Sequence, residues 1–208
     1  MSDSNNIKKK KIGKPIASTS LNRKAGLSLN PSKIKSCIVT QLNLSNNDIN
    51  HKINTDALVY ITAIIEYLVF EILELSGNIV TKGKSIKREH IVKAIQNDTE
   101  LIKIFNNLDY DNIEVNIITS DGKKMLKIVN DNLSLSTEGG SLLSNLVREF
   151  LTQFTDTLNK NQKTFTLDDI KNGFDSFMES NGWKENIYKH CIQDGDKAVD
   201  KLNAFEKK

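Results

Sequence analysis

Residues 59–78, VYITAIIEYLVFEILELSGN, decide the fold of this chain of 208 residues. From Leu58, just before this stretch, apolar residues recur at steps of three and four, the period of one helix face: Leu58, Ile61, Ile65, Leu68, Ile72 and Leu75. Further apolar side chains lie on the other faces: Tyr60, Ile64, Val69, Phe70 and Leu73. Glu66, Glu71 and Glu74 would be costly in a bilayer. The stretch therefore predicts a long helix inside a globular protein, capped by Thr55 and ended by Gly77.

Shorter helices are expected on both sides of this long helix. Pro31 suits a first helical turn, and Ile34, Ile38 and Leu42 then recur every four residues. A polar loop is expected over residues 43–54. After a lysine-rich loop, two further short helices are predicted from apolar residues at Ile91, Ala94, Ile95, Leu101, Ile104 and Phe105.

The second half of the chain repeats this plan. A second long helix is predicted from the apolar stripe Leu143, Val147, Phe150, Phe154 and Leu158. Thr166 and Asp169 resemble a capping box at the start of the next helix, and a last amphipathic helix begins near Lys184. Residues 113–129 alternate apolar and polar side chains around Ser120-Asp121-Gly122. This alternation leaves open a β-hairpin instead of a connector followed by a helix from Lys123.

The fold class predicted from these patterns is all-α, with two helix-loop-helix-loop-helix units. A long helix that is apolar on several faces cannot be covered by its own short helices, so the two units must interlock. Because they share one chain, their pairing is intramolecular and independent of concentration. We divide the chain into a disordered basic tail (1–29), a first unit (30–106), a connector (107–122) and a second unit with the final helix (123–205).

Charge is distributed unevenly along the chain. Residues 1–37 carry nine positive side chains and one negative side chain, so this part has a net charge of +8 within a total of +3. The remainder is therefore net negative by five. A basic arm on a mildly acidic body is typical of a polyanion-binding tail, although such runs are also common as solvated tails. The N-terminus has no apolar run of the signal-peptide kind, and we expect an intracellular protein.

Several segments of the chain resemble core histones. VYITAIIEYLVFEILELSGN (59–78) resembles the central helix of histone 2A, KAIQNDTEL (93–101) resembles the start of its C-terminal segment, and RKAGLSL (23–29) resembles the entry to its fold. KMLKIVNDNLSLS (124–136) and KHCIQDGDKAV (189–199) are similar to the first and final helices of histone 2B. The resemblance covers about residues 23–106 and 124–203. It implies two fused histone folds that form an intramolecular heterodimer, as in the histone doublets of giant DNA viruses.

The resemblance also implies a function. A nucleosomal histone doublet would bind and wrap double-stranded DNA without sequence specificity, together with a histone three/four-like partner. Its location would be chromatin in the nucleus, or the virion and viral factory of a giant virus, with no membrane association. Two alternatives stay open: a sequence-specific transcription factor of the CCAAT-binding type, whose subunits also resemble these histones, and a protein-only interaction module. The chain has no glutamine-rich activation segment, which favours packaging over the first alternative.

In the histone pair, loops and helix ends meet at three places along one edge, where backbone amides and helix N-termini can hold phosphates. At the first place, the resemblance would bring together Lys33, Lys35, Lys123, Lys124 and Lys127. At the second place it would bring together Lys52, Lys160 and Lys163. At the third place it would bring together Lys82, Lys84, Lys87, Arg88, Ser134, Ser136 and Thr137. Each lysine alone is more often a solvated surface residue, and their shared position at the loops is what favours a DNA-binding edge.

The resemblance also implies a second site, which is acidic. Six residues match positions of the nucleosome acidic patch, where arginine-bearing partners dock: Glu66, Glu71, Glu74, Asp98, Glu100 and Asp194. Thr99 and Asn186 stand where the family has further acids. Exposed glutamates on a helix can also serve only solubility, but the spacing places Glu66, Glu71 and Glu74 near one flank.

Arginine is scarce at the predicted DNA-binding edge. The whole chain contains Arg23, Arg88 and Arg148 beside 26 lysines, whereas nucleosomal histones insert arginines into the minor groove. Lys52 takes the place of the first-loop arginine of histone 2A, and Lys84-Ser85 replaces its Thr-Arg pair. Lysine keeps the charge but lacks the planar fork of arginine. We therefore expect this protein to hold wrapped DNA less tightly than nucleosomal histones do.

Catalytic and metal chemistry have little support in the sequence. No phosphate-binding glycine loop or zinc-protease helix is present, and His51, His90 and His190 have no partners nearby in sequence. Asp168 and Asp169 are better explained as helix-start residues than as an acid–base pair. The two cysteines stand alone, far apart. We expect no enzyme, no metal site and no cofactor.

Overall fold

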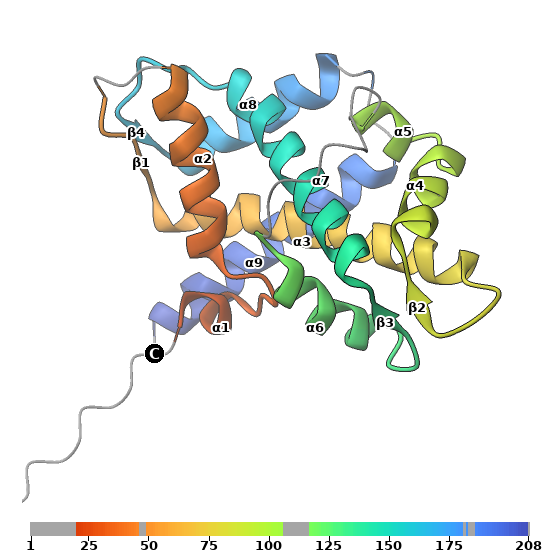
Figure 1. Cartoon of the computed structure of the whole chain (residues 1–208). Helices are drawn as coiled ribbons and strands as arrows, with labels where there is room; N and C mark the ends of the chain where they lie inside the picture. Colours follow the sequence, from red (N-terminus) through yellow and green to blue (C-terminus); the bar gives the residue numbers. More distant parts are fainter. Residues whose placement is uncertain (1–19, 46–48, 106–116, 181, 183–185, 208) are drawn as a thin grey trace, which may run out of the picture.

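The computed structural model describes residues 20–45, 49–105, 117–180, 182 and 186–207, which are mostly helical, as predicted (Figure 1). The first half contains α1 (Leu21–Ala25), α2 (Pro31–Ser45), β1 (Lys52–Ile53), α3 (Thr55–Ile79), β2 (Ser85–Ile86), α4 (Arg88–Asn97) and α5 (Leu101–Ile104). The second half contains α6 (Thr119–Val129), β3 (Ser134–Leu135), α7 (Thr137–Asp156), β4 (Thr164–Phe165), α8 (Leu167–Ser180) and α9 (Asn186–Glu206). The plan of short helix, long helix and short helix thus occurs twice.

Helix α3 forms the axis of the core. It contacts α2 and α4 from its own half and α6, α7, α8 and α9 from the other half (Figure 1). Side chains on several of its faces are buried, among them Ile61, Ile64 and Leu73. The prediction that this helix is packed on several sides is confirmed. Because α9 makes the most extensive of these contacts and α6, α7 and α8 add to it, the long apolar stretch of the first half is buried mainly by the second half.

Two pairs of very short parallel strands join the loops of the two halves. Strand β1, before α3, pairs with β4, after α7, and strand β2, after α3, pairs with β3, before α7. The start of each central helix therefore lies beside the end of the other central helix. The sequence patterns predicted loops at these places but not their pairing, because two-residue strands are too short to show a period.

The close approach of α9 to α3 depends on a glycine. A Cβ atom at Gly195 would lie 2.5 Å from Cε2 of Tyr60. The Tyr60 side chain is itself buried. Gly195 thus lets α9 pack directly against the aromatic ring on α3.

The predicted disordered tail to residue 29 is wrong for its last part. Residues 21–25 form α1, Gly26 ends this helix with φ of 71°, and Leu29 is fully buried. The reason is tertiary: the carboxylate of Glu66 on α3 accepts hydrogen bonds from the backbone N–H groups of Ser28 and Leu29, both at 2.7 Å. Residues 1–19 of the tail lie outside the described residues.

Helix α6 begins four residues earlier than predicted. It starts at Thr119 instead of Lys123, and the N–H of Gly122 donates a helical hydrogen bond to the carbonyl of Ile118 at 2.7 Å. Asp121 and Gly122 are buried, and a Cβ at Gly122 would lie 3.0 Å from Leu143. The β-hairpin alternative is therefore wrong for residues 117–129. Residues 106–116 of the predicted connector lie outside the described residues.

Two predicted helix starts have different outcomes. Thr55, expected to cap α3, is its first residue, and Asn54 occupies the cap position. The capping box before α8 is confirmed, because Asp169 accepts from the N–H of Thr166 at 2.7 Å and donates its own N–H to the Thr166 hydroxyl at 3.3 Å. The predicted start of the last helix at Lys184 lies outside the described residues.

Candidate nucleic-acid interface

The β2–β3 pairing assembles the third predicted place of the lysine edge. The N–H of Ser134 donates to the carbonyl of Lys84 at 2.8 Å, and the N–H of Ser136 donates to the carbonyl of Ile86 at 3.0 Å. Lys82, Lys84 and Lys87 are exposed beside it. Ser136 caps α7 by accepting from the N–H of Gly139 at 3.0 Å. The N-terminus of a 20-residue helix thus lies beside exposed lysines, an arrangement that attracts anions.

The β1–β4 pairing assembles the second predicted place. The N–H of Lys52 donates to the carbonyl of Lys163 at 2.8 Å, so the backbones of these two exposed residues are in contact. The buried His51 ring lies behind this pairing, where Nδ1 is 3.0 Å from the carbonyl oxygen of Gln162. Lys160 is less available for phosphate binding than Lys52 and Lys163, because its ammonium group pairs with Asp156 at 2.7 Å.

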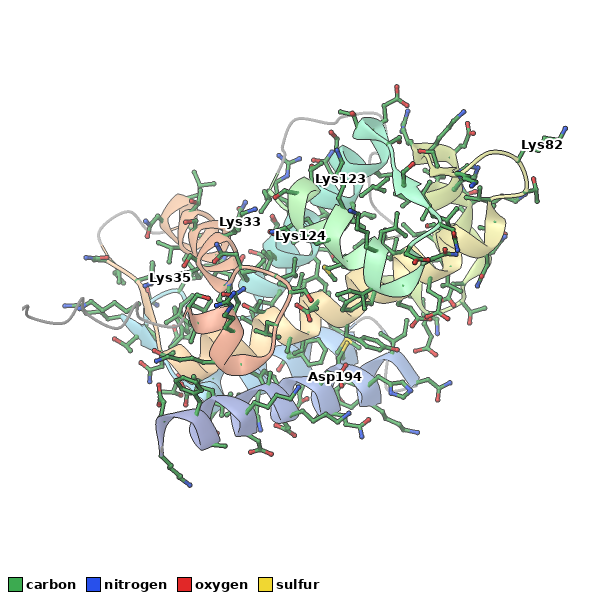
Figure 2. All side chains as sticks on the ribbon, turned by 90° about the horizontal axis from the view of Figure 1, so that it is seen from below. Lys33, Lys35, Lys82, Lys123, Lys124 and Asp194 are labelled. Atoms are coloured by element: carbon green, nitrogen blue, oxygen red, sulfur yellow. The ribbon has the colours of Figure 1, made fainter. Side chains whose placement is uncertain are left out.

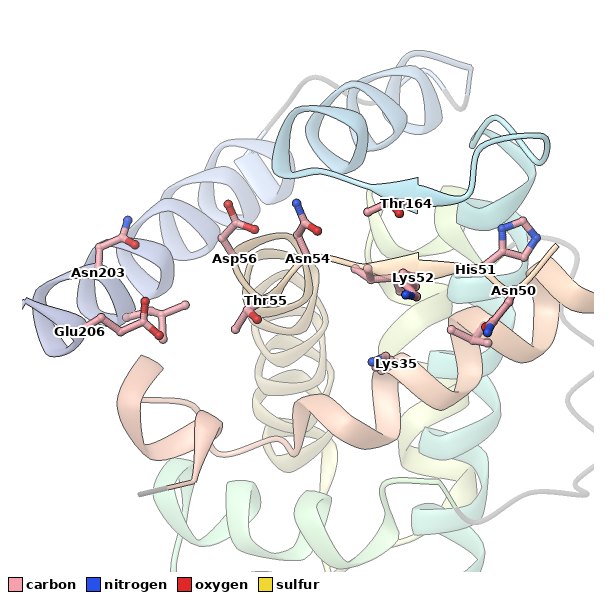
Figure 3. Close-up of a pocket in the computed structure, with 13 residues that line it drawn as sticks. Lys35, Asn50, His51, Lys52, Asn54, Thr55, Asp56, Thr164, Asn203 and Glu206 are labelled. Atoms are coloured by element: carbon pink, nitrogen blue, oxygen red, sulfur yellow. The ribbon is translucent and has the colours of Figure 1, made fainter. Parts of the chain in front are cut away.

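Lys35 does not join the residues with which it was predicted to lie. It lines an open hollow of about 800 Å³ beside β1, where Figure 3 shows it on α2 facing Lys52. Asp56 and Glu206 line the same hollow, so its charge is mixed. The placement follows from the pitch of α2, because Lys33 and Lys35 are two positions apart on the helix and therefore point in different directions.

The first predicted place is organised by an aspartate that sequence reasoning missed. Lys33 on α2 pairs with Asp121 on α6 at 2.8 Å, and Lys124 approaches the same carboxylate at 3.9 Å. Asp121 is 5% exposed. Figure 2 shows Lys33, Lys123 and Lys124 on these two helices, with Lys82 on the separate β2 loop. Lys33 is therefore partly committed to holding the two halves together, whereas Lys123 and Lys127 are exposed.

Three of the six predicted acidic residues have structural roles. Glu66 holds the turn after α1, and Asp98 accepts from the N–H groups of Glu100 and Leu101 at the start of α5. Glu100 accepts from the N–H of Ile187 at 2.8 Å, at the start of α9. The Glu66 and Glu100 contacts join segments far apart in the chain and have no signal in the sequence pattern, whereas the Asp98 contacts are local.

The acidic residues nevertheless lie close enough to influence one another. Burial raises the pKa of Glu71, and the charges of Glu74 and Asp98 raise it further. Burial likewise raises the pKa of Glu66, with a smaller contribution from Asp194. Burial raises the pKa of the fully buried Cys191 thiol, and the charges of Asp194, Glu100 and Glu71 raise it further. Glu66, Glu71 and Glu74 lie on α3, Asp98 and Glu100 lie in the turn between α4 and α5, and Asp194 lies on α9; we call these six residues the acidic cluster. Figure 2 shows Asp194 on α9, apart from the labelled lysines.

Metal-binding and membrane-spanning features are absent from the part of the chain that the structure describes. No group of three or more histidine, cysteine, aspartate or glutamate side chains there could hold a metal ion. No helix within those residues is both long and apolar enough to span a bilayer. Of the histidines, His90 accepts from the N–H of Lys87 at 3.0 Å and so helps to start α4.

A long central helix flanked by shorter helices is the plan of the histone fold, and known sequences agree with it. A histone 2A of Meyerozyma guilliermondii is 36% identical to this chain over 103 residues, which are 49% of this chain and 75% of that protein. A histone 2A of Eremothecium gossypii is 33% identical over 119 residues, 53% of this chain and 86% of that protein. A histone 2A of Tetrahymena pyriformis is 44% identical over 66 residues, 31% of this chain and 50% of that protein.

The chain belongs to the histone 2A family. It spans only about half the length of the Tetrahymena relatives. No family model matches the chain, and no solved structure matches it.

Proposed function

We propose that this chain is a histone doublet that binds and wraps double-stranded DNA without sequence preference. The single observation that carries the proposal is the pair of parallel strand contacts, β1 with β4 and β2 with β3, each of which joins a loop of the first half to a loop of the second. Each contact places exposed lysines from one half beside backbone of the other half. Phosphate contacts by such lysines give affinity without reading the bases.

The second part of the proposal concerns the identity of the two units. We assign residues 30–106 to a histone 2A-like fold and residues 123–205 to a histone 2B-like fold, which together act as one heterodimer. What supports this assignment is that α3 is buried mainly by helices of the second half, with α9 making the largest contact. A first half expressed alone would expose that apolar surface.

The proposed partners follow from the same assignment. Histone three/four-like proteins would complete the wrapped particle, and arginine-bearing proteins would dock on the acidic cluster. The proposed location is chromatin in a nucleus, or the virion and viral factory of a giant DNA virus. The proximity of Glu71 and Glu74 supports the docking site, since neighbouring carboxylates attract a cationic partner.

Nuclease footprinting on a random DNA pool and on defined DNA sequences tests the proposal. Uniform protection of both is expected, because lysine contacts to phosphate carry no sequence information. One preferred site would favour the alternative, a sequence-specific transcription factor of the CCAAT-binding type. Absence of salt-sensitive DNA binding would favour a protein-only interaction module. Reconstitution with histone three/four-like proteins before digestion then measures the length of DNA protected.

A further inference from the structure

A partly apolar groove lies between the C-terminal half of α3 and the end of α6. Its volume is about 500 Å³, and it is lined by Phe70, Leu73, Glu74, Gly77, Asn78, Ile128, Val129 and Asn130. Ile128 is 66% exposed, and Phe70 is only partly buried. A single exposed aliphatic residue is ordinary, but an isoleucine and a phenylalanine on the walls of one groove leave adjoining apolar surface uncovered.

The groove adjoins the acidic cluster. Glu74 supplies the charge among the residues that line it, and Glu71 lies one residue beyond Phe70 on α3. Glu74 is exposed, and the structure gives Glu71 a neutral partner, the Tyr67 hydroxyl at 3.3 Å. A ligand that suits this surface therefore carries an apolar side chain close to positive charges.

The chain contains a segment with this chemistry. Residues 7–16, IKKKKIGKPI, combine five lysines with three isoleucines and have no acidic residue. We propose that this lysine-rich segment docks in cis on the groove, with an isoleucine against Phe70 and Ile128 and lysines beside Glu71 and Glu74.

The entry of the chain into the fold makes this docking reachable. Ala25, Gly26 and Leu27 line a small hollow together with Phe70, so the end of α1 lies beside a residue that also lines the groove. Helix α1 is only about 7.5 Å long at 1.5 Å per residue, so its first residue lies close to its last. Extended chain spans up to about 3.3–3.6 Å per residue, so Lys14 reaches roughly 20 Å from Ser20 and Lys8 roughly 40 Å. The groove, from Phe70 to Gly77, is only about 10 Å long.

The docking has a consequence for DNA binding that rests on the proposed function. Lysines held beside Glu71 and Glu74 cannot contact phosphates at the same time. In the free protein, the lysine-rich segment would cover Glu71 and Glu74. DNA would compete for the lysines and release the segment from the groove. The free and DNA-bound proteins would then present different surfaces to partners.

Zero-length carbodiimide cross-linking of the full chain without DNA tests the docking. The sample is an equal mixture of unlabelled and ¹⁵N-labelled protein, and cross-linked peptides are identified by mass spectrometry. Amide links from lysines 8–14 to Glu71 or Glu74 are expected, joined within molecules of the same isotope. Ile128→Gln should lower their yield roughly ten-fold, because the docked segment loses the burial of one aliphatic side chain.

Leu44→Gln is the matched control, since Leu44 is 73% exposed on α2, outside the groove, and this variant should keep the wild-type yield. Absence of links to Glu71 and Glu74 would overturn the proposal, and so would an equal loss in both variants. Links of mixed isotope would show that the segment of a second copy occupies the groove, which overturns docking in cis. Because no DNA is present, each of these failures leaves the DNA-binding proposal to its own footprinting test.

Discussion

At the scale of single residues, Glu66 connects the entry of the chain to the central helix. Its carboxylate lies on α3 and satisfies two backbone N–H groups that follow α1, at Ser28 and Leu29. Buried backbone donors without acceptors are costly. A residue predicted for a partner-binding site therefore also stabilises the fold.

Replacing Glu66 separates these two roles. Glu66→Ala should lower the free energy of unfolding by about 1–3 kcal/mol, because two partly buried donors lose their acceptor. Glu66→Gln keeps an oxygen acceptor and removes the charge, so its loss should be smaller. Urea denaturation of both variants measures the difference. Equal stability of the alanine and glutamine variants would contradict the structural role of the carboxylate.

Glu71 should make stability depend on pH. Burial raises its pKa in the folded protein, so the folded state binds the proton more tightly than the unfolded chain does. Stability from this group is therefore gained as pH falls through the raised pKa, and the charged carboxylate costs stability at neutral pH. Glu71→Gln should raise the free energy of unfolding at pH 7 by about 0.5 kcal/mol.

The advantage of Glu71→Gln should shrink as pH falls and disappear near pH 3, where the wild-type carboxyl is protonated in both states. Denaturation curves at the two pH values measure this. A benefit that is constant with pH would show that the raised pKa of Glu71 is not its cause.

At the scale of helices, Gly195 sets the distance between α9 and α3. Gly195→Ala should destabilise the fold by about 1–3 kcal/mol, because the new methyl group would lie 2.5 Å from the ring of Tyr60 and force α9 away. Gln193→Ala, an exposed position on the same helix, is the control and should have little effect. Thermal unfolding of the two variants compares them. A neutral Gly195→Ala would mean that α9 packs less closely on α3 than described.

Sequence patterns predicted the helices with long apolar stripes but missed the elements held by distant contacts. The stripes of α3 and α7 are local, so their period suffices. Helix α1 depends on Glu66, 37 residues beyond Leu29, and the first turn of α6 contains Asp121, which pairs with Lys33, 88 residues away. The same limit applies to the site: the resemblance to histones grouped Lys84 with Ser134 and Lys52 with Lys163, but it placed Lys35 wrongly.

At the scale of the whole molecule, the scarcity of arginine should limit how tightly a wrapped particle is held. Arginine sheds its hydration readily in a narrow minor groove, whereas the lysine ammonium stays hydrated near the phosphates. The double variant Lys52→Arg with Ser85→Arg should therefore raise the salt concentration at which DNA unwraps. Lys52 lies in β1 and Ser85 lies in β2, and these strands pair through backbone hydrogen bonds. The double variant should therefore keep both strand pairings.

Fluorescence transfer across a salt titration of reconstituted particles measures that unwrapping. The double variant is compared with wild type at equal protein and DNA concentrations. An unchanged midpoint would show that arginine scarcity does not set particle stability.

The most direct test of the proposed DNA-binding edge is the salt dependence of DNA affinity. Replacing Lys82, Lys84 and Lys87 together by alanine should reduce the magnitude of the log–log slope by up to about 0.9 for each lost phosphate contact. All three side chains are exposed, so the fold should persist. The control replaces Lys189, Lys197 and Lys201, three exposed lysines of α9 outside both strand pairings, and should keep the wild-type slope. An unchanged slope in the first variant, or an equal fall in both, would contradict a DNA-binding edge at the β2–β3 pairing.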